Sequence, residues 1–455
     1  MRILESIFYR AAKSTARSAP DPGCWISRLH QVRSTDHFLD TNRSFSRIPT
    51  FPLRQSSRNR VDSKAMNAQQ NTDRISRVQA PVIPIVGGWI SEHPNTISLG
   101  QGMVHYAAPA EVSRAISAAV SADPCVDKYG LVRGNPDLLK TIQLKLENEN
   151  QIRIDDRQRL IFTSGSNMGF VNTVLAIGDV EDEIILLSPY YFNHEMAIQL
   201  AGCRPVIVAT NSNYQIDLDR LESAITSRTR AIVTVSPNNP TGAVYSRESL
   251  VAVNEMCRLH NVYHVSDEAY EYFIYGNDDH FSPASLSDVA DHTISLFSLS
   301  KAYGMAGWRC AYQVVPAHLE MAINKIQDTN LVCPPIISQI AAQAALQVGS
   351  GWCREKIAGF RQVRDLVLDE LSTLGDRCRV PQPDGAFYAL LQLSTDESDM
   401  ALVEQLIRDY GVAVMPGSAF GDTSRCSLRV AFGALQPHAV AEGVGRLVRG
   451  LRKLI

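Results

Sequence analysis

SLSKAYGMAGWR, residues 298–309, begins where a run of β-branched and apolar residues, TISLFS at 293–298, comes to an end. Such a run predicts a buried β-strand. Five similar runs precede it: RLIFTS (159–164), EIILLS (183–188), PVIVA (205–209), AIVTVS (231–236) and VYHVS (262–266). Segments with a helical pattern, such as SRESLVAVNEMCRLHN, lie between them. This alternation predicts right-handed crossovers and a mostly parallel sheet covered on both faces, so the fold class is α/β.

After about residue 315 the pattern changes to long helical stretches, followed by AFYALLQL, VAVMP and SLRVAFG as strands of a smaller sheet. The change indicates a second domain. We expect a large domain over residues 126–330 and a small C-terminal domain over 331–455. Residues 76–125 are expected to form an N-terminal arm that contributes to the small domain.

The first 65 residues differ in composition from the rest of the chain. They hold twelve Lys and Arg against five acidic residues and show no sustained apolar period, so we expect little packed structure over residues 1–75. The Arg-rich opening MRILESIFYRAAKSTAR is typical of a targeting helix, but translation starting at Met66 would explain the segment equally well. The expected location is therefore the cytoplasm, or an organelle if the segment is a transit peptide.

The composition also limits the partners. With 45% hydrophobic residues and a formal net charge of −3, nothing in the chain favours nucleic acid or an anionic membrane surface. The nine cysteines form no CxxC pair, so no metal site is predicted, and no apolar run is long enough to cross a membrane. A small molecule is the expected partner.

Several predicted strands end in polar residues. SGSN follows the first strand, SPYY the second, SPNNPTG the fourth, SDEAY the fifth and SLSK the sixth. Ligands of open parallel sheets bind in the crevice beyond the carboxyl ends of the strands, so these segments are expected to meet at one edge.

Lys301 stands out at this edge because its neighbours are chemically unusual. A lone lysine at a strand end is most often a solvated surface charge. Here Ser298, Ser300 and Arg309 accompany it, and hydroxyls, a guanidinium and glycine-flanked amides are the groups that bind a phosphate monoester. A lysine amine beside a phosphate site indicates a phosphorylated aldehyde held covalently, which predicts pyridoxal 5'-phosphate as cofactor.

Three further residues complete this prediction. Asp267 at the end of a predicted strand can keep the pyridine nitrogen of the cofactor protonated, although an isolated aspartate there is more often a helix N-cap. Asn239 and Tyr270 can donate hydrogen bonds to the phenolic oxygen of the cofactor ring. Taken alone, NPTG is equally an ordinary β-turn.

The motifs NNPTG, SDEAY, SxSKxxGxxGWR and LRVAFG, which follow one another along the chain, resemble the class I pyridoxal-phosphate-dependent aminotransferases of fold type I over about residues 78–452. SPYYFN, YEYFIY, KIQD and GSGW are similar to segments of plant-type methionine and aromatic amino-acid aminotransferases. The resemblance implies a large domain with a mostly parallel seven-stranded sheet and a smaller α/β C-terminal domain.

The resemblance also implies roles for individual residues. Lys301 would hold the cofactor and later move the proton at the substrate Cα. Phosphate would be bound by Ser298, Ser300 and Arg309 together with Ser166 and Asn167, and Tyr191 would stack on the ring. Arg429 would bind the substrate α-carboxylate, and Gly102 would let the backbone approach it. Tyr129 would reach the phosphate of a neighbouring subunit, which implies a homodimer.

Three functions compete for this sequence. An aminotransferase, which passes an amino group from an L-amino acid to a 2-oxo acid in two half-reactions, is favoured. A pyridoxal-phosphate lyase, such as a carbon–sulfur lyase, is the alternative, because one cofactor site supports several bond cleavages. A DNA-binding regulator is disfavoured, since the first 65 residues contain no helix-turn-helix pattern.

The identity of the amino donor is the least determined feature. A second arginine for a dicarboxylate side chain cannot be placed, so aspartate and glutamate stay possible. The aromatic residues Tyr106 and Phe192 favour an aromatic or methionine-like donor.

Overall fold

The computed structural model describes residues 72–122, 124–276 and 280–455. Expectations for residues 1–71, including the targeting helix and the start at Met66, lie outside the described residues. The predicted end of the N-terminal extension at residue 75 falls within a short helix, α2 (Asp73–Arg77).

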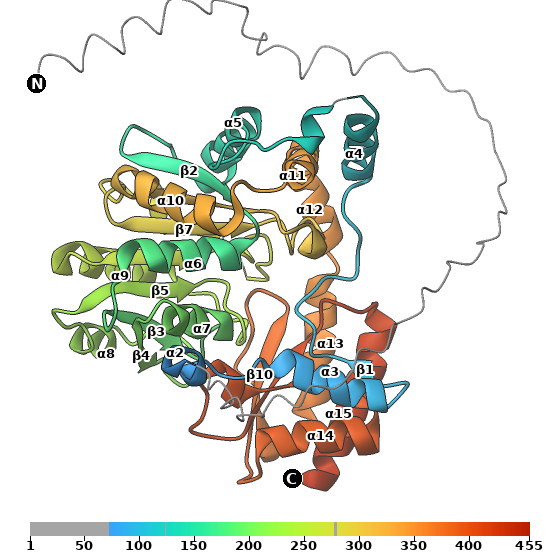
Figure 1. Cartoon of the computed structure of the whole chain (residues 1–455). Helices are drawn as coiled ribbons and strands as arrows, with labels where there is room; N and C mark the ends of the chain where they lie inside the picture. Colours follow the sequence, from blue (N-terminus) through green and yellow to red (C-terminus); the bar gives the residue numbers. More distant parts are fainter. Residues whose placement is uncertain (1–71, 123, 277–279) are drawn as a thin grey trace, which may run out of the picture. The chain divides into compact units, whose positions relative to one another are not determined.

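A seven-stranded sheet forms the centre of the large domain (Figure 1), in the order β2-β8-β7-β6-β5-β3-β4. The strands are β2 (Gln158–Thr163), β3 (Glu183–Ser188), β4 (Arg204–Ala209), β5 (Thr229–Val235), β6 (Tyr263–Asp267), β7 (Thr293–Ser298) and β8 (Ala311–Pro316). The predicted α/β class and the mostly parallel seven-stranded sheet are confirmed. Sequence reasoning missed one strand, β8.

The directions of the strands explain where the site lies. β8 runs antiparallel to both of its neighbours, β2 and β7, whereas β7, β6, β5, β3 and β4 are parallel. β2 therefore points the same way as β7. The carboxyl ends of β2, β3, β5, β6 and β7 lie at one edge of the sheet, and the polar segments that follow these strands meet there.

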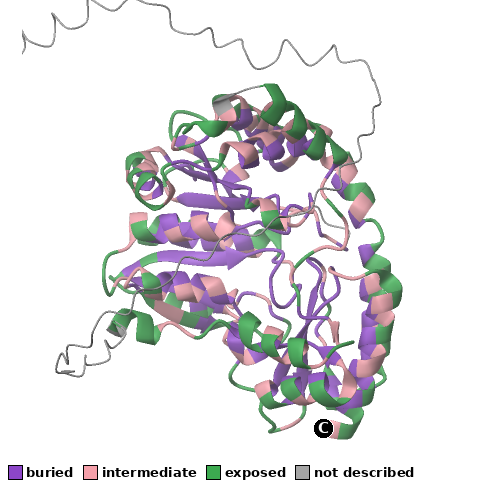
Figure 2. Ribbon diagram, turned by 45° about the vertical axis from the view of Figure 1, so that its right-hand side comes forward, coloured by how far each residue is buried: buried purple, intermediate pink, exposed green. Residues whose placement is uncertain are grey.

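Alternating side chains of each strand bury the sheet on both faces. On β3, Ile184 and Leu186 pack with residues of α6 (Ser166–Ile177) and α7 (Phe192–Leu200), whereas Ile185 and Leu187 pack with α8 (Leu218–Ser223) and α9 (Arg247–His260). This period of two is what a strand covered on both faces requires. Figure 2 shows the result as buried strands between helices with exposed outer faces.

The small domain is built from two sheets. One contains β9 (Cys378–Arg379), β10 (Tyr388–Leu393), β12 (Met415–Pro416) and β13 (Ser427–Ala431) in the order β12-β13-β10-β9, all antiparallel. The other pairs β1 (Ile97–Ser98) with β11 (Val412–Ala413) in parallel. The predicted strand VAVMP is therefore divided between two sheets, and β1 joins the N-terminal arm to the small domain.

Further helices complete the two domains. They are α3 (Val82–Glu92), α4 (Ala110–Ala122), α5 (Pro136–Lys145), α10 (Glu320–Leu331), α11 (Ile336–Val348), α12 (Ser350–Ile357), α13 (Phe360–Ser372), α14 (Asp399–Tyr410) and α15 (Pro437–Leu454). α13 and α14 pack on α15, and α3 packs on α14. α11, which lies beyond the expected boundary at residue 331, packs on α4 and α5.

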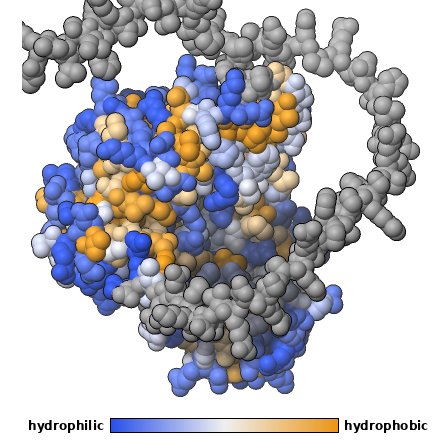
Figure 3. Space-filling model, in the orientation of Figure 1, coloured by the Kyte–Doolittle hydropathy of each residue, from blue (hydrophilic) through white to orange (hydrophobic). Residues whose placement is uncertain are grey.

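The surface in Figure 3 is mostly hydrophilic, with hydrophobic residues gathered over the region of α6 and α10. Leu175 of α6 and Met321 of α10 are exposed apolar side chains. None of the helices in the described part of the chain is both long and apolar enough to cross a membrane.

Candidate active site

A cavity of about 430 Å³ lies at the carboxyl edge of the large sheet, between it and the small domain. Twelve of the thirteen residues singled out in the sequence line it. They are Gly102, Ser166, Asn167, Tyr191, Asn239, Asp267, Tyr270, Ser298, Ser300, Lys301, Arg309 and Arg429. Residues from Gly102 to Arg429 thus meet in one place, as expected for loops that follow parallel strands.

Lys301 follows β7 and points into the cavity, where its Nζ donates a hydrogen bond to the carbonyl of Gly102 at 2.6 Å. Burial, followed by the positive charges of Arg429 and Arg309, lowers the pKa of the Lys301 amine to about 8, and the Asp267 carboxylate opposes the shift. An amine with this pKa is in part uncharged near neutral pH, which is what a nucleophilic or proton-accepting lysine needs.

Groups that are suited to an anion gather where α6 begins. Gly165 precedes the helix with φ of +89°, and no side chain caps the first turn, so the backbone N–H groups there stay free for a ligand. The Arg309 guanidinium lies against Gly165 so closely that a Cβ on Gly165 would be 2.1 Å from Nη2. Ser298 Oγ accepts from the N–H of Ser300 at 3.2 Å. Gly165 was not among the predicted residues, although its place before a helix start was a usable signal.

Asp267 is the last residue of β6 and is 5% exposed. Its Oδ2 lies 3.1 Å from Nε2 of the buried His194, and its Oδ1 accepts from the N–H of Ala269 at 3.1 Å. His194 in turn stacks on Phe170 with 4.0 Å between the ring centroids. His194 therefore fixes one oxygen of Asp267. Sequence reasoning missed it, because a histidine three residues after Tyr191 reads as part of helix α7.

Asn239 and Tyr270 are in direct contact, since Asn239 Nδ2 lies 3.3 Å from the Tyr270 hydroxyl. The Tyr270 hydroxyl also shares a hydrogen bond with the hydroxyl of Tyr388 at 2.9 Å. Burial, followed by Tyr388, raises the pKa of Tyr270 well above its usual value, so the hydroxyl stays protonated. Tyr388 lines the cavity from β10 and was also missed, because it lies within an apolar run of the small sheet.

Arg429 on β13 is the buried cation at the small-domain side of the cavity, with 3% of its surface exposed. Its Nη1 donates to Asn239 Oδ1 at 3.0 Å and its Nη2 to the carbonyl of Gly100 at 2.6 Å, while its Nε is buried without a partner. Its guanidinium stands 4.7 Å from the ring centroids of both Tyr388 and Phe420. A planar cation held in this way is suited to a carboxylate ligand.

Two residues complete the walls. Tyr191 is the N-cap residue of α7, and burial raises the pKa of its hydroxyl. At Gly102 a Cβ would lie 2.6 Å from the Tyr388 hydroxyl and 3.9 Å from Lys301 Nζ. A side chain at this position would therefore collide with the Tyr388 hydroxyl. The predicted approach of the Gly102 backbone to a substrate carboxylate stays a prediction.

Two of the aromatic residues named in the sequence analysis do not line the cavity. Tyr129, which was expected to reach the site of a neighbouring subunit, is 84% exposed on its own chain. Tyr106, expected beside the donor, instead donates hydrogen bonds to the backbone carbonyls of Lys301 (3.3 Å) and Ala302 (3.0 Å) behind the cavity. It supports the lysine loop and contributes no wall, whereas Phe192 does line the cavity.

Comparison with known proteins agrees with this geometry. Residues 94–447 match the model of the family described as aminotransferase class I and II. An aromatic aminotransferase of Arabidopsis thaliana is 32% identical over 384 residues, which cover 82% of this chain and 94% of the relative. An aspartate/prephenate aminotransferase of Thermus thermophilus is 32% identical over 329 residues, 71% of this chain and 83% of the relative.

Solved structures give the same result. The aspartate aminotransferase of Thermus thermophilus with maleate has a TM-score of 0.77 at 30% identity, covering 84% of this chain and 100% of that one. The aromatic aminotransferase of Pyrococcus horikoshii has a TM-score of 0.75 at 29% identity, with 81% and 100% covered. The family match spans every residue that lines the cavity except those from α3, so the chain belongs to the class I and II aminotransferases and is a transaminase.

Proposed function

We propose that this transaminase uses pyridoxal 5'-phosphate to move the amino group of an aromatic or methionine-like L-amino acid to a 2-oxo acid. The observation that carries the proposal is the position of Lys301, whose amine shares one cavity with the anion site at the start of α6 and with the carboxylate of Asp267. A phosphorylated pyridine aldehyde needs a group at each of these three places.

The residues present fit that cofactor. The free N–H groups of α6, Ser166, Ser298, Ser300 and Arg309 offer donors for a phosphate, and the lack of a Cβ on Gly165 lets the Arg309 guanidinium lie close to the start of α6. Asp267, held by His194, would keep the ring nitrogen protonated. Bound there, the cofactor supplies an electron sink for the pair released when the Cα–H bond of the substrate breaks.

The protein's own residues divide the remaining work. Arg429 binds and orients the α-carboxylate of the amino acid, which fixes the direction in which Cα faces Lys301. Lys301 Nζ would take the proton from Cα and deliver it to the carbon that carries the aldehyde of the free cofactor, and its pKa of about 8 suits both steps near neutral pH. Asn239 accepts a hydrogen bond from Arg429 and donates one to Tyr270, so the three side chains are held in fixed positions relative to one another.

The preference for an apolar donor rests on the composition of the cavity wall. The larger apolar side chains that line it include Ile83, Val86, Ile90, Met103, Phe192, Val235 and Met415. The cations that line the cavity within the described residues are Lys301, Arg309 and Arg429, and each has a role already. The relatives named above include both aromatic and aspartate aminotransferases, so the donor is the part of the proposal to test first.

The test is an absorbance spectrum of the purified protein, followed by titration with phenylalanine, methionine, aspartate and alanine in turn. We expect a band of bound cofactor that phenylalanine or methionine bleaches and that a 2-oxo acid restores. A response to aspartate alone would contradict the donor preference. Release of ammonia and a 2-oxo acid in a single step would favour the lyase, and the lack of any bound chromophore would refute the cofactor.

We further propose that the enzyme is a homodimer in which the partner subunit's copy of the exposed Tyr129 reaches the anion site. The support is the family resemblance and the 84% exposure of this large aromatic side chain beside exposed Leu131. Light scattering should give twice the mass of the chain, and Tyr129→Phe should weaken cofactor binding. A monomer with full cofactor affinity would contradict this. The cytoplasm is the proposed location.

A further inference from the structure

The turn after β6 carries residues that line the cavity and, beside them, two glutamates that do not. Asp267 and Tyr270 line the cavity, whereas Glu268 and Glu271 do not. The side chain of Glu268 is nevertheless buried, with 1% of its surface exposed, and that of Glu271 is only 10% exposed. A buried carboxylate is costly unless it is paired and hydrogen-bonded, so the partners of these two residues bear on the turn that carries Asp267 and Tyr270.

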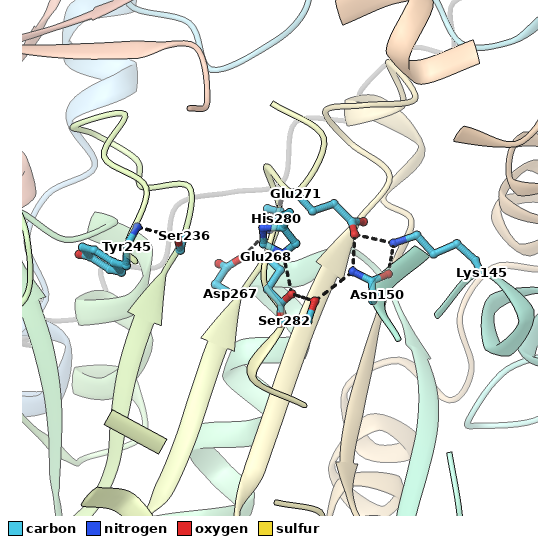
Figure 4. A network of polar contacts seen from close by, with 10 residues as sticks. Lys145, Asn150, Ser236, Tyr245, Asp267, Glu268, Glu271, His280 and Ser282 are labelled. Carbon is cyan, nitrogen blue, oxygen red and sulfur yellow. Dashed lines mark hydrogen bonds and ion pairs between the residues drawn. The ribbon is translucent and has the colours of Figure 1, made fainter. Parts of the chain in front are cut away.

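Glu271 is held by Lys145, the last residue of α5, and by Asn150, which lies in the turn that follows α5 (Figure 4). Its Oε2 accepts from Lys145 Nζ at 2.5 Å and from Asn150 Nδ2 at 2.8 Å. Lys145 Nζ also donates to Asn150 Oδ1 at 2.7 Å, and its side chain is only 6% exposed. The three side chains therefore form a closed triangle around one buried ion pair.

Asn150 extends the triangle to Glu268. Its Nδ2 also donates to Ser282 Oγ at 3.0 Å, and the Ser282 hydroxyl donates to Glu268 Oε2 at 2.5 Å (Figure 4). His280 Nε2 lies 2.8 Å from the same Glu268 oxygen. The side-chain amide of Asn150 thus connects the carboxylate of Glu271, directly, with that of Glu268, through Ser282.

An irregular helix turn makes this connection possible. α5 ends at Lys145 and is followed by a π-helical turn, Leu146–Asn150, which closes at Gln151 with φ of +58°. In π geometry residues five apart become neighbours, which brings Lys145 and Asn150 together, whereas an α-helix would pair Lys145 with Glu149. Such turns are rare and recur at functional sites.

We propose that Lys145, Asn150 and Glu271 are positioning residues that hold the 267–271 turn so that Asp267 and Tyr270 face the cofactor. They line no part of the cavity and act only through those two residues. The inference rests on the proposed function, because it needs pyridoxal phosphate as the ligand of Asp267 and Tyr270. It assigns to α5 and its π-helical turn a role in cofactor affinity that the site residues alone do not reveal.

The test compares cofactor binding in three variants with that of the wild type. Lys145→Met removes the ammonium but keeps a side chain of similar length, which leaves Glu271 buried with Asn150 as its remaining donor. Should this variant fail to fold, the double variant Lys145→Met/Glu271→Met, which leaves no unpaired charge at this position, provides the measurement. The readouts are the dissociation constant of pyridoxal phosphate, by equilibrium dialysis of apoprotein, and the pH midpoint of the bound cofactor's visible absorbance.

Glu183→Gln is the matched control. Glu183 is another fully buried carboxylate with basic partners, Arg204 and Arg228, but it lies at the opposite, amino end of the sheet. We expect the dissociation constant to rise about tenfold in the Lys145 variants, the order seen when residues behind a ligand-binding group are changed, together with a shifted absorbance midpoint. The Glu183 variant should lose thermal stability while both readouts stay at wild-type values.

Two results would overturn the proposal in different ways. If the Lys145 variants lose only thermal stability and keep the wild-type dissociation constant and absorbance midpoint, the network is merely structural and the proposed cofactor stands. If the wild-type protein binds no pyridoxal phosphate, the proposed function and this inference fail together.

Discussion

In the cofactor-free protein, the Lys301 amine should titrate near pH 8, and changes to its charged neighbours should move the titration in opposite directions. The shift has one main cause and three smaller ones. Burial lowers the pKa most, Arg429 and Arg309 lower it further, and Asp267 raises it. Arg429→Gln should therefore move the midpoint upward, and Asp267→Asn should move it downward.

The uncharged fraction of Lys301 at pH 7 follows from its pKa, and it can be compared with that of an ordinary lysine. At pH 7 an amine with a pKa of about 8 is roughly one-tenth uncharged. At an ordinary lysine pKa of about 10.4 the uncharged fraction is on the order of 0.04%. The cavity thus raises the reactive fraction of Lys301 roughly 250-fold at pH 7.

Competitive trace acetylation measures this fraction directly. Apoprotein is labelled with acetic anhydride between pH 6 and pH 11, and the Lys301 peptide is quantified by mass spectrometry against a free lysine derivative in the same tube. A midpoint near pH 8 in the wild type, with opposite displacements in the two variants, is expected. A wild-type midpoint near the ordinary lysine value, or displacements of the same sign, would refute the electrostatic reasoning.

Three further substitutions test other parts of the cavity. Gly165→Ala should weaken the binding of inorganic phosphate and of pyridoxal phosphate at least about tenfold, because φ of Gly165 is +89° and the new Cβ would displace Arg309. Unchanged affinity in equilibrium dialysis would contradict the anion site. Arg429→Lys should lower kcat/KM for the amino donor about hundredfold, equivalent to about 2.7 kcal/mol, mainly by raising KM, because lysine cannot form two parallel hydrogen bonds to a carboxylate. Wild-type kinetics in this variant would exclude Arg429 as the residue that binds the α-carboxylate. Tyr388→Phe should cost about 1 kcal/mol in urea denaturation through the lost hydrogen bond to Tyr270, and a gain in stability would show that the contact is unfavourable.

The strands of the large sheet were largely predictable from sequence, because burial on both faces produces unbroken apolar runs. β3 and β7 occupy the predicted residues 183–188 and 293–298. β8 escaped prediction because its run, AYQVVP, contains Gln313. This side chain is fully buried, and its Oε1 accepts a hydrogen bond from Thr173 at 3.0 Å, while its Nε2 has no partner among the described residues. A tertiary contact therefore offsets part of the polar group that disguised the strand.

The site was predictable where chemistry and chain position coincide, as in the loops that follow strands. Lys301 and Asp267 were found for this reason. His194 and Tyr388 were not, because their roles come from contacts between elements distant in sequence. Tyr388 is 118 residues from Tyr270, and no local pattern indicates that their hydroxyls meet.

The pairing of β1 with β11 has a consequence for protein synthesis. All seven strands of the large sheet, and Lys301, have been translated by residue 316, whereas β11 and Arg429 are made near the end of the chain. Since domains generally fold as they leave the ribosome, the cofactor half of the cavity can form on the growing chain while β1 still lacks its partner. A message truncated before codon 412 would encode Lys301 and the start of α6 without Arg429. Loss of the last tenth of the chain would thus abolish turnover more completely than it abolishes folding of the large sheet.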